Sequence, residues 1–69
     1  MIPKVNQLVS TPNGKGICQG KIYANGQLEI MVSYAPETKI NPDLCQSLAG
    51  DGKGAWWLAT YLESQVSIG

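Results

Sequence analysis

Large apolar residues recur at every second position between residues 27 and 35 of this chain. Leu28, Ile30, Val32 and Tyr34 occupy the even positions, while Gln, Glu, Met, Ser and Ala occupy the odd ones. Successive side chains of a strand point to opposite sides, so a period of two is typical of a half-buried β-strand. We therefore predict a strand over residues 27–35 whose even positions face the core.

Turn residues divide the preceding sequence into two further strands. The stretch 5–11 (VNQLVST) ends in the turn sequence PNGKG at 12–16, where proline and glycine suit the corners of a turn. A second strand follows at 16–24. Asn25 and Gly26 then give the strongest short-range signal for a hairpin, because both residues tolerate positive φ.

The second strand changes the face on which it carries large apolar residues. Ile17 is at an odd position and Ile22 at an even one, so the core face must switch between them. Gly20 lies in this interval, and glycine inside a strand is typical of a β-bulge. We predict a bulge at Gly20 that bends the strand.

Residues 36–54 interrupt the pattern with two prolines and a glycine-rich end, GDGKG. Pro42 suits the first position of a short helical turn. The apolar residues after it would share one face of that turn: Leu44, Cys45 and Leu48. GDGKG lacks the GxxxxGK[ST] pattern of a phosphate-binding loop, and we expect a flexible hairpin loop there. Residues 36–54 are therefore predicted to be an irregular, insertion-like loop, and loops of this length usually have a function.

The last part of the chain predicts a strand, a turn and a short closing strand. AWWLAT at 55–60 is the fourth predicted strand, YLES at 61–64 is predicted to be a 3-10 turn, and QVSI at 65–68 a fifth strand. The chain therefore predicts an all-β fold without repeats or heptads.

The composition is that of one small globular domain, 1–69. Apolar residues make up 43% of its 69 residues, which is too high for a disordered chain. A single core of this size rarely supplies more than about 3–5 kcal/mol of stability. A homo-oligomer is therefore one of the expected states.

Charge argues against several classes of partner. Charged residues are only 14% of the chain, the five basic residues are all lysines at separate positions, and they balance five acidic ones. Nucleic-acid binding rests on clustered lysine and arginine, so we do not expect it. The N-terminus lacks a secretion signal and no stretch approaches the ~20 apolar residues of a membrane span. We expect a cytoplasmic protein that does not bind membranes.

The chain offers few groups for catalysis or metal binding. It has no histidine, and its two cysteines, Cys18 and Cys45, are not spaced as a metal site. We expect two reduced thiols, with a disulfide between them as the alternative. No catalytic, cofactor-binding or metal-binding residue is predicted, and we expect a protein that is not an enzyme.

Two stretches resemble small SH3-like domains of the KOW and Tudor type. LVSTPNGKGICQG (8–20) is similar to their strand–turn–strand opening, and WWLATYLESQV (56–66) is similar to their aromatic strand, 3-10 turn and last strand. The resemblance implies a small SH3-like barrel of about five short antiparallel strands with a 3-10 turn before the last strand. It covers about two-thirds of the chain and leaves residues 36–54 unexplained.

The resemblance implies an architecture shared by several activities. KOW domains carry basic loops, whereas this chain has one lysine in its first turn and one in its glycine-rich loop. A Tudor-type cage for methylated side chains would need several free aromatic rings. Type II dihydrofolate reductases are oligomeric barrels of similar length, but MVSYAP (31–36) is only a distant echo of their VQIYP signature. We expect instead a non-enzymatic protein-binding module, an adaptor or inhibitor encoded by a phage or mobile element. The first alternative is a KOW-like domain that binds nucleic acid or associates with the ribosome. The second alternative is a small oligomeric barrel enzyme of the type II dihydrofolate reductase kind.

The two adjacent tryptophans must point to opposite faces of their strand. Trp56 shares a face with Leu58, so we predict that Trp56 is in the core beside Ile30 and Val32. Trp57 then points outward, either covered by the 36–54 loop or exposed as an anchor for an unidentified protein partner, since tryptophan is a frequent interface hot spot. The predicted partner-binding residues are Trp57, Met31, Tyr61 and Lys53.

Overall fold

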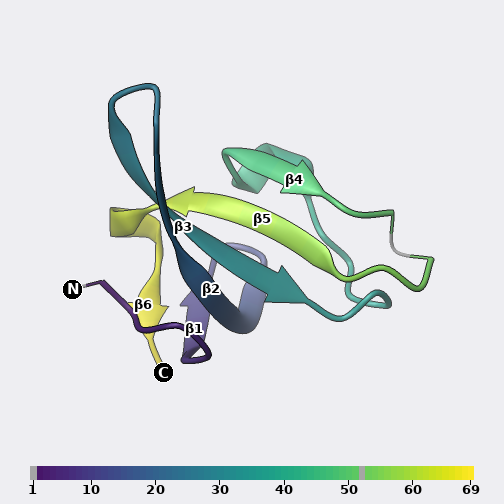
Figure 1. The fold of residues 1–69 in the computed structure, drawn as a ribbon. Helices are drawn as coiled ribbons and strands as arrows, with labels where there is room; N and C mark the ends of the chain where they lie inside the picture. Colours follow the sequence, from purple (N-terminus) through teal and green to yellow (C-terminus); the bar gives the residue numbers. More distant parts are fainter. Residues whose placement is uncertain (1, 52) are drawn as a thin grey trace.

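A computed structural model describes residues 2–51 and 53–69, and it is all-β (Figure 1). Gly52, in the predicted hairpin loop, lies outside the described residues. The strands are β1 (Leu8–Thr11), β2 (Gly14–Ala24), β3 (Gln27–Tyr34), β4 (Ser47–Ala49), β5 (Trp57–Leu62) and β6 (Ser67–Ile68). Two 3-10 turns accompany them, η1 (Pro42–Leu44) and η2 (Glu63–Gln65).

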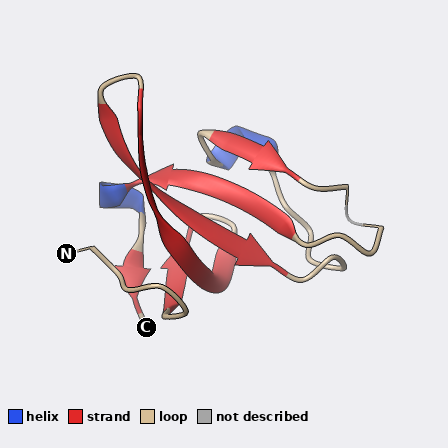
Figure 2. Ribbon diagram, viewed as in Figure 1, coloured by secondary structure: helices blue, strands red, loops and turns tan. Residues whose placement is uncertain are grey.

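All six strands are antiparallel members of one sheet, in the order β4-β5-β3-β2-β1-β6. Figure 2 shows strands and short turns throughout, and no helix in the described residues is long and apolar enough to cross a membrane. The all-β prediction is confirmed. The strands β4 and β6 end the sheet, and no pairing among the described residues closes one edge onto the other.

The predicted core face of β3, the bulge and the hairpin turn are confirmed, but the apolar residues expected to mark the core face of β2 do not do so. Cys18 is fully buried, whereas Ile17 is only half-buried on the opposite face and Ile22 is 36% exposed. Ile30 and Val32 are fully buried on the even face of β3. The pairing of β2 with β3 shifts register between Cys18 and Gly20, which is the predicted bulge. Asn25 has φ of 53°, and the glycine after it also has positive φ, as a tight turn between twisted strands requires.

The 36–54 loop contains one element that was predicted and one that was not. The 3-10 turn η1 begins after Asn41, whose side chain accepts a hydrogen bond from the backbone N–H of Asp43. The strand β4 was not predicted, because its three residues carry too little pattern to be recognised alone. Of the apolar residues predicted to share a face, Cys45 and Leu48 pack against the core, whereas Leu44 is exposed.

The C-terminal elements lie about two residues later than predicted. The strand predicted at 55–60 is β5, and the 3-10 turn predicted at 61–64 is η2. Residues Tyr61 and Leu62 therefore belong to β5 rather than to the turn. This shift decides the orientation of the two tryptophans.

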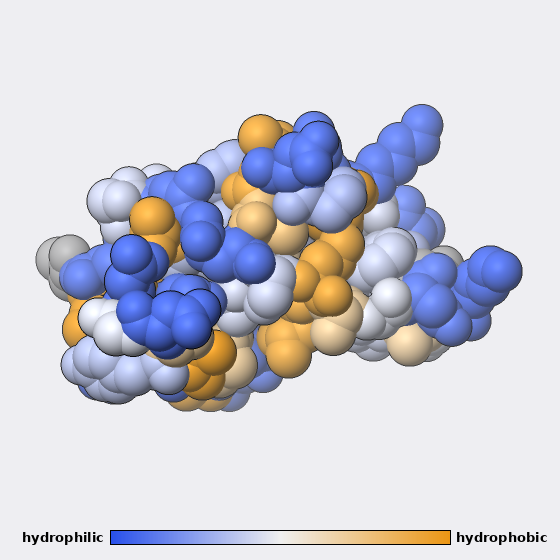
Figure 3. Space-filling model, turned by 90° about the horizontal axis from the view of Figure 1, so that it is seen from above, coloured by the Kyte–Doolittle hydropathy of each residue, from blue (hydrophilic) through white to orange (hydrophobic). Residues whose placement is uncertain are grey.

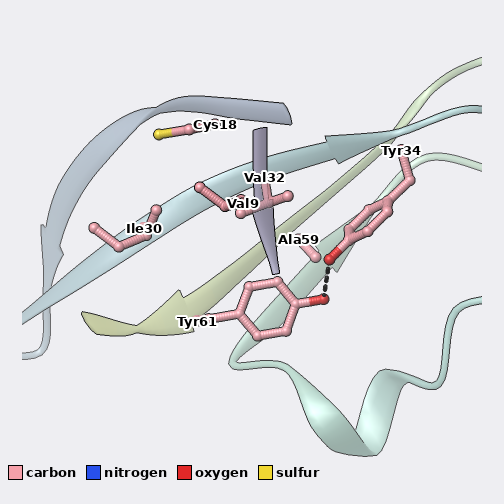
Figure 4. Close-up of a cluster of buried hydrophobic side chains, with 7 residues drawn as sticks. All are labelled: Val9, Cys18, Ile30, Val32, Tyr34, Ala59 and Tyr61. Atoms are coloured by element: carbon pink, nitrogen blue, oxygen red, sulfur yellow. Dashed lines mark hydrogen bonds between the residues drawn. The ribbon is translucent and has the colours of Figure 1, made fainter. Parts of the chain in front are cut away.

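Seven side chains form the core between the curled strands (Figure 4): Val9, Cys18, Ile30, Val32, Tyr34, Ala59 and Tyr61. The hydroxyls of Tyr34 and Tyr61 are hydrogen bonded at 2.8 Å, and Tyr34 also contacts the hydroxyl of Thr11. Buried hydroxyls need such partners, since an unpaired one would cost about 1–3 kcal/mol. The hydrogen bond between the two tyrosines thus gives each buried hydroxyl a partner.

The same network holds the 36–54 loop against the first turn. The Asn13 side-chain amide donates to the Tyr61 hydroxyl at 3.0 Å and to the backbone carbonyl of Asn41 at 3.2 Å. Its carbonyl oxygen accepts from the backbone N–H of Asn41 at 2.8 Å. The Asn13 side chain therefore hydrogen bonds the loop to the turn between β1 and β2.

Buried Tyr34 predicts a loss of stability in alkali. Burial raises the pKa of Tyr34 well above its ordinary value of about 10. The unfolded chain therefore releases this proton at lower pH than the folded chain does, so the stability is fully present below about pH 10 and falls as the pH rises above it. We expect unfolding in urea to shift to lower denaturant between about pH 10 and 11, and Tyr34→Phe to remove part of this slope. A midpoint that does not change over this interval would contradict the prediction.

Candidate functional site

A row of side chains crosses the face of the sheet opposite the core. Residues paired across antiparallel strands point to the same side. The register pairs Leu8 with Ile17, Ile17 with Ser33, Ser33 with Leu58, and Leu58 with Ala49. We call these five residues the outer row, because their strand neighbours Val9, Cys18, Val32 and Ala59 are in the core.

Four of the five residues of the outer row are apolar, and the row is partly accessible. Leu8 is 45% exposed and Leu58 is 37% exposed, while Ile17 between them is half-buried. Monomeric proteins normally expose large apolar residues singly rather than as connected sets. Seen from above, the molecule presents hydrophobic residues in the middle of that surface, interspersed with polar ones (Figure 3).

A groove of about 470 Å³ lies on this face. It is lined by Ile17, Gln19, Ser33, Trp56, Trp57 and Leu58. Two of its polar groups are engaged with each other: the Gln19 amide donates to the Ser33 hydroxyl at 2.9 Å, and Ser33 donates to the Ile17 carbonyl at 3.3 Å. The groove therefore combines apolar walls with a small polar floor, a composition typical of binding sites.

The predicted orientation of the tryptophans is wrong. Trp56 is 59% exposed, whereas Trp57 is half-buried and packs against the core. The indole N–H of Trp57 donates to the backbone carbonyl of Pro36 at 3.2 Å. The start of the 36–54 loop therefore holds Trp57, which agrees with the alternative in which this loop covers the ring. The exposed ring is Trp56.

The register of β5 explains the reversal. Ile30 is paired with Tyr61 and Val32 with Ala59, so the odd residues of β5 face the core. The prediction ranked Leu58 above Ala59 as a core residue and assigned Tyr61 to a turn. Once Tyr61 is included in the strand, burial of its large ring is favoured over burial of Leu58, which lies on the opposite face. Trp56 shares the face of Leu58 and therefore points outward.

The four predicted partner-binding residues do not form one surface. Tyr61 is fully buried, so its predicted place on a binding surface is wrong. Trp57 lines the groove but is held by Pro36, and Met31 is half-buried on the outer face, opposite Thr60 rather than near Trp57. Lys53 is exposed in the loop before β5.

The sequence reasoning missed Trp56, Ile17, Gln19, Ser33 and Leu58. They could have been found by comparing the odd with the even positions of residues 57–62 as core candidates, with Tyr61 counted as part of the strand. Once Tyr61 is placed in the core, period two puts residues 56, 58 and 60 on the outer face. The outer row then follows from pairing with β3.

The loop before β5 sets the position of Trp56. Gly50 has φ of +110°, and a Cβ atom on it would lie 2.7 Å from the backbone carbonyl oxygen of Trp56. Only glycine allows so close an approach at this φ. The backbone of the 36–54 loop thus packs directly on the residue that carries the exposed ring.

The lining of the groove contains no charged residue. In the part of the chain that the structure describes, no three histidine, cysteine, aspartate or glutamate side chains are grouped to hold a metal ion. Cys18 and Cys45 are both free, and the pKa of the Cys45 thiol is raised, first by burial and then by nearby Asp43. What this surface can provide is apolar contact area with a few hydrogen bonds.

Comparison with known proteins adds no assignment, because no family model, curated protein or solved structure matches the chain.

Proposed function

We propose that this chain is a small, non-enzymatic protein-binding module that docks a partner protein on its outer sheet face. The observation that carries the proposal is the exposed Trp56 ring beside a 470 Å³ apolar groove. Tryptophan gives a large contact area at a low cost in side-chain entropy, which is why it is frequent among interface hot spots. The proposal keeps the aromatic strand and the 36–54 loop as the binding elements but replaces Trp57 by Trp56.

Charge favours a protein over a nucleic acid as the partner. The groove lining is neutral, and the chain has no arginine to pair with phosphates. Uncharged and aromatic residues are typical of the centre of protein interfaces. The partner surface that fits best is therefore apolar and uncharged.

We also propose that the architecture is SH3-like. The features that support it are a second strand bulged between Cys18 and Gly20, and a 3-10 turn, Glu63–Gln65, directly before the last strand. In this proposal β4 is an addition at the edge of the sheet, contributed by the 36–54 loop. The addition extends the outer face beyond β5.

Trp56→Ala tests the binding proposal. Since Trp56 is exposed, we expect the free energy of unfolding to change by no more than about 0.5 kcal/mol. Proteins retained from cell lysate by the immobilised wild-type chain should be lost with this variant. With a purified partner, the dissociation constant should rise at least ~30-fold, the scale of a hot-spot residue.

Tyr23→Ala is the matched control, because Tyr23 is 77% exposed and does not line the groove. This variant should retain the same proteins as the wild type. If Trp56→Ala lowers stability strongly, or retains the same proteins as the wild type, the groove is not the binding site.

A further inference from the structure

The end of the β2–β3 hairpin carries a strand edge that has no partner strand among the described residues. The contacts of β1 with β2 end at Cys18, so residues 20–24 of β2 pair with β3 alone. The end of the hairpin extends beyond the rest of the sheet (Figure 1). We propose that this free edge, residues 20–24, is a docking site for an extended segment of a partner protein, which adds to the sheet as an antiparallel strand. The site is separate from the groove, whose lining includes none of these residues.

Lys21 and Tyr23 direct their main-chain groups out of the free edge. The turn at 25–26 has positive φ at both positions, so the flanking residues Ala24 and Gln27 exchange both of their main-chain hydrogen bonds. In an antiparallel pair, residues bonded in this way alternate with residues whose N–H and C=O face away from the partner strand. Counting back from the turn, Lys21 and Tyr23 are the residues that face away from β3, and no other main-chain group of the described residues bonds to them there.

These groups are complementary to the main chain of another strand. Two residues with one donor and one acceptor each are repeated at ~6.8 Å along the edge, which is the repeat of an extended chain. Lys21, Ile22 and Tyr23 are all exposed, so an added strand can reach them. Binding of this kind takes its affinity from main-chain hydrogen bonds and its specificity from side chains at alternate positions.

Lys21 sets the charge of the partner segment. Lysine on a free edge discourages unselective strand pairing, because a strand that pairs there must accommodate its charge. Lys21 is exposed, and its neighbour across β3 is the uncharged Ile30. An acidic residue opposite Lys21 therefore forms a favourable cross-strand pair, whereas a basic residue there is repelled. The next residue of the segment lies beside Ile22 on the other side of the sheet and is apolar.

An NMR titration of the isotope-labelled chain with the synthetic peptide TVTVET tests the inference. In antiparallel pairing, its glutamate lies opposite Lys21 and the preceding valine opposite Ile22. We expect the largest signal changes at residues 20–24, with a dissociation constant on the order of 0.1–1 mM, because a short peptide loses much conformational freedom on binding. Solvent exchange of the Lys21 and Tyr23 amide hydrogens should slow at least ~10-fold at saturation. The peptide TVTVKT should bind at least ~5-fold more weakly, because it opposes two like charges.

Two substitutions of Tyr23 separate its main chain from its side chain. Proline is tolerated on an edge strand where its nitrogen faces away from the ladder, so Tyr23→Pro should stay folded but lose one donor of the free edge. Its affinity for TVTVET should fall at least ~10-fold, whereas Tyr23→Ala keeps both main-chain groups and should bind within about threefold of the wild type. Circular dichroism in urea checks that both are folded. Unfolding of Tyr23→Pro would show that this N–H is bonded within the sheet and would contradict the free edge.

Lys21→Glu tests the charge selectivity with an exposed residue that is not needed for folding. This variant should reverse the preference and bind TVTVKT more tightly than TVTVET. Trp56→Ala should bind TVTVET as the wild type does, so the result is independent of the groove.

Several results would overturn the proposal. These are no binding of either peptide well above the expected dissociation constant, equal affinities of Tyr23→Pro and the wild type, and an unchanged preference of Lys21→Glu. Signal changes confined to the groove would place the peptide there instead. A sedimentation mass above 7.4 kDa that Tyr23→Pro lowers would assign the free edge to a second copy of the chain rather than to a partner segment.

Discussion

Tyr61→Ala is expected to abolish cooperative folding. Tyr61 is fully buried, its ring is the largest of the fully buried side chains, and its hydroxyl bonds Tyr34 and Asn13. Truncating a buried aromatic residue to alanine costs about 3–5 kcal/mol. A core of this size rarely supplies more than about 3–5 kcal/mol in total, so the loss is comparable with the whole stability. Far-UV circular dichroism in a urea titration measures the outcome.

Two further variants show which part of Tyr61 matters. One removes only its hydroxyl, and the other removes an exposed aromatic ring elsewhere as a control. Tyr61→Phe keeps the ring and removes the two hydrogen bonds, so we expect a folded protein destabilised by about 1–3 kcal/mol. Tyr23→Ala removes an exposed ring and should leave the urea midpoint within the range of a surface substitution. Cooperative unfolding of Tyr61→Ala at the wild-type midpoint would show that this residue is not in the core.

Gly16→Val is expected to unfold the protein although valine is a better strand-forming residue. Gly16 lies in β2, and a Cβ atom on it would be 2.5 Å from Cγ1 of Val32, 2.8 Å from Cε1 of Tyr34 and 2.9 Å from the backbone oxygen of Ser33. Two of these atoms belong to buried side chains and the third to the sheet backbone, so none can move freely. Overpacking of this kind costs about 1–3 kcal/mol for a small insertion, and valine adds two further methyl groups.

Lys15→Val is the matched control for this change. Lys15 precedes Gly16 in the same strand but is exposed. Valine at position 15 should keep or slightly raise the stability, since strand propensities differ by up to about 1 kcal/mol. In the same urea titration, we expect the midpoint to fall for Gly16→Val and to stay or rise slightly for Lys15→Val. Equal stabilisation by both would mean that propensity outweighs the packing of Gly16 on β3.

The local features of the first two-thirds of the chain were predictable because neighbouring residues decide them. The alternation in β3, the bulge before Gly20 and the turn at Asn25 each follow from the conformational limits of a few adjacent residues. The strand β4 was not predictable, because three residues become a strand only when β5 offers an edge to pair with. Its existence depends on a contact rather than on a pattern.

The candidate site was predicted as an aromatic strand face, but with the wrong face outward. Period two requires that Trp56 and Trp57 point to opposite sides, and this requirement holds in the structure. It does not say which of them is buried. That choice depends on pairing between β3 and β5, where Ile30 lies opposite Tyr61.

Adjacent residues were enough to predict the all-β class, the alternation of β3, the bulged hairpin and the division of the tryptophans between two faces. Steric limits on φ and the two-residue period of a strand act within a few bonds, so they can be read from adjacent residues. The tertiary structure decided that Tyr61 belongs to the core, that Trp56 is the exposed ring and that five strands align the outer row. These outcomes depend on register between segments far apart in the chain, and a register is selected by how well whole faces pack together.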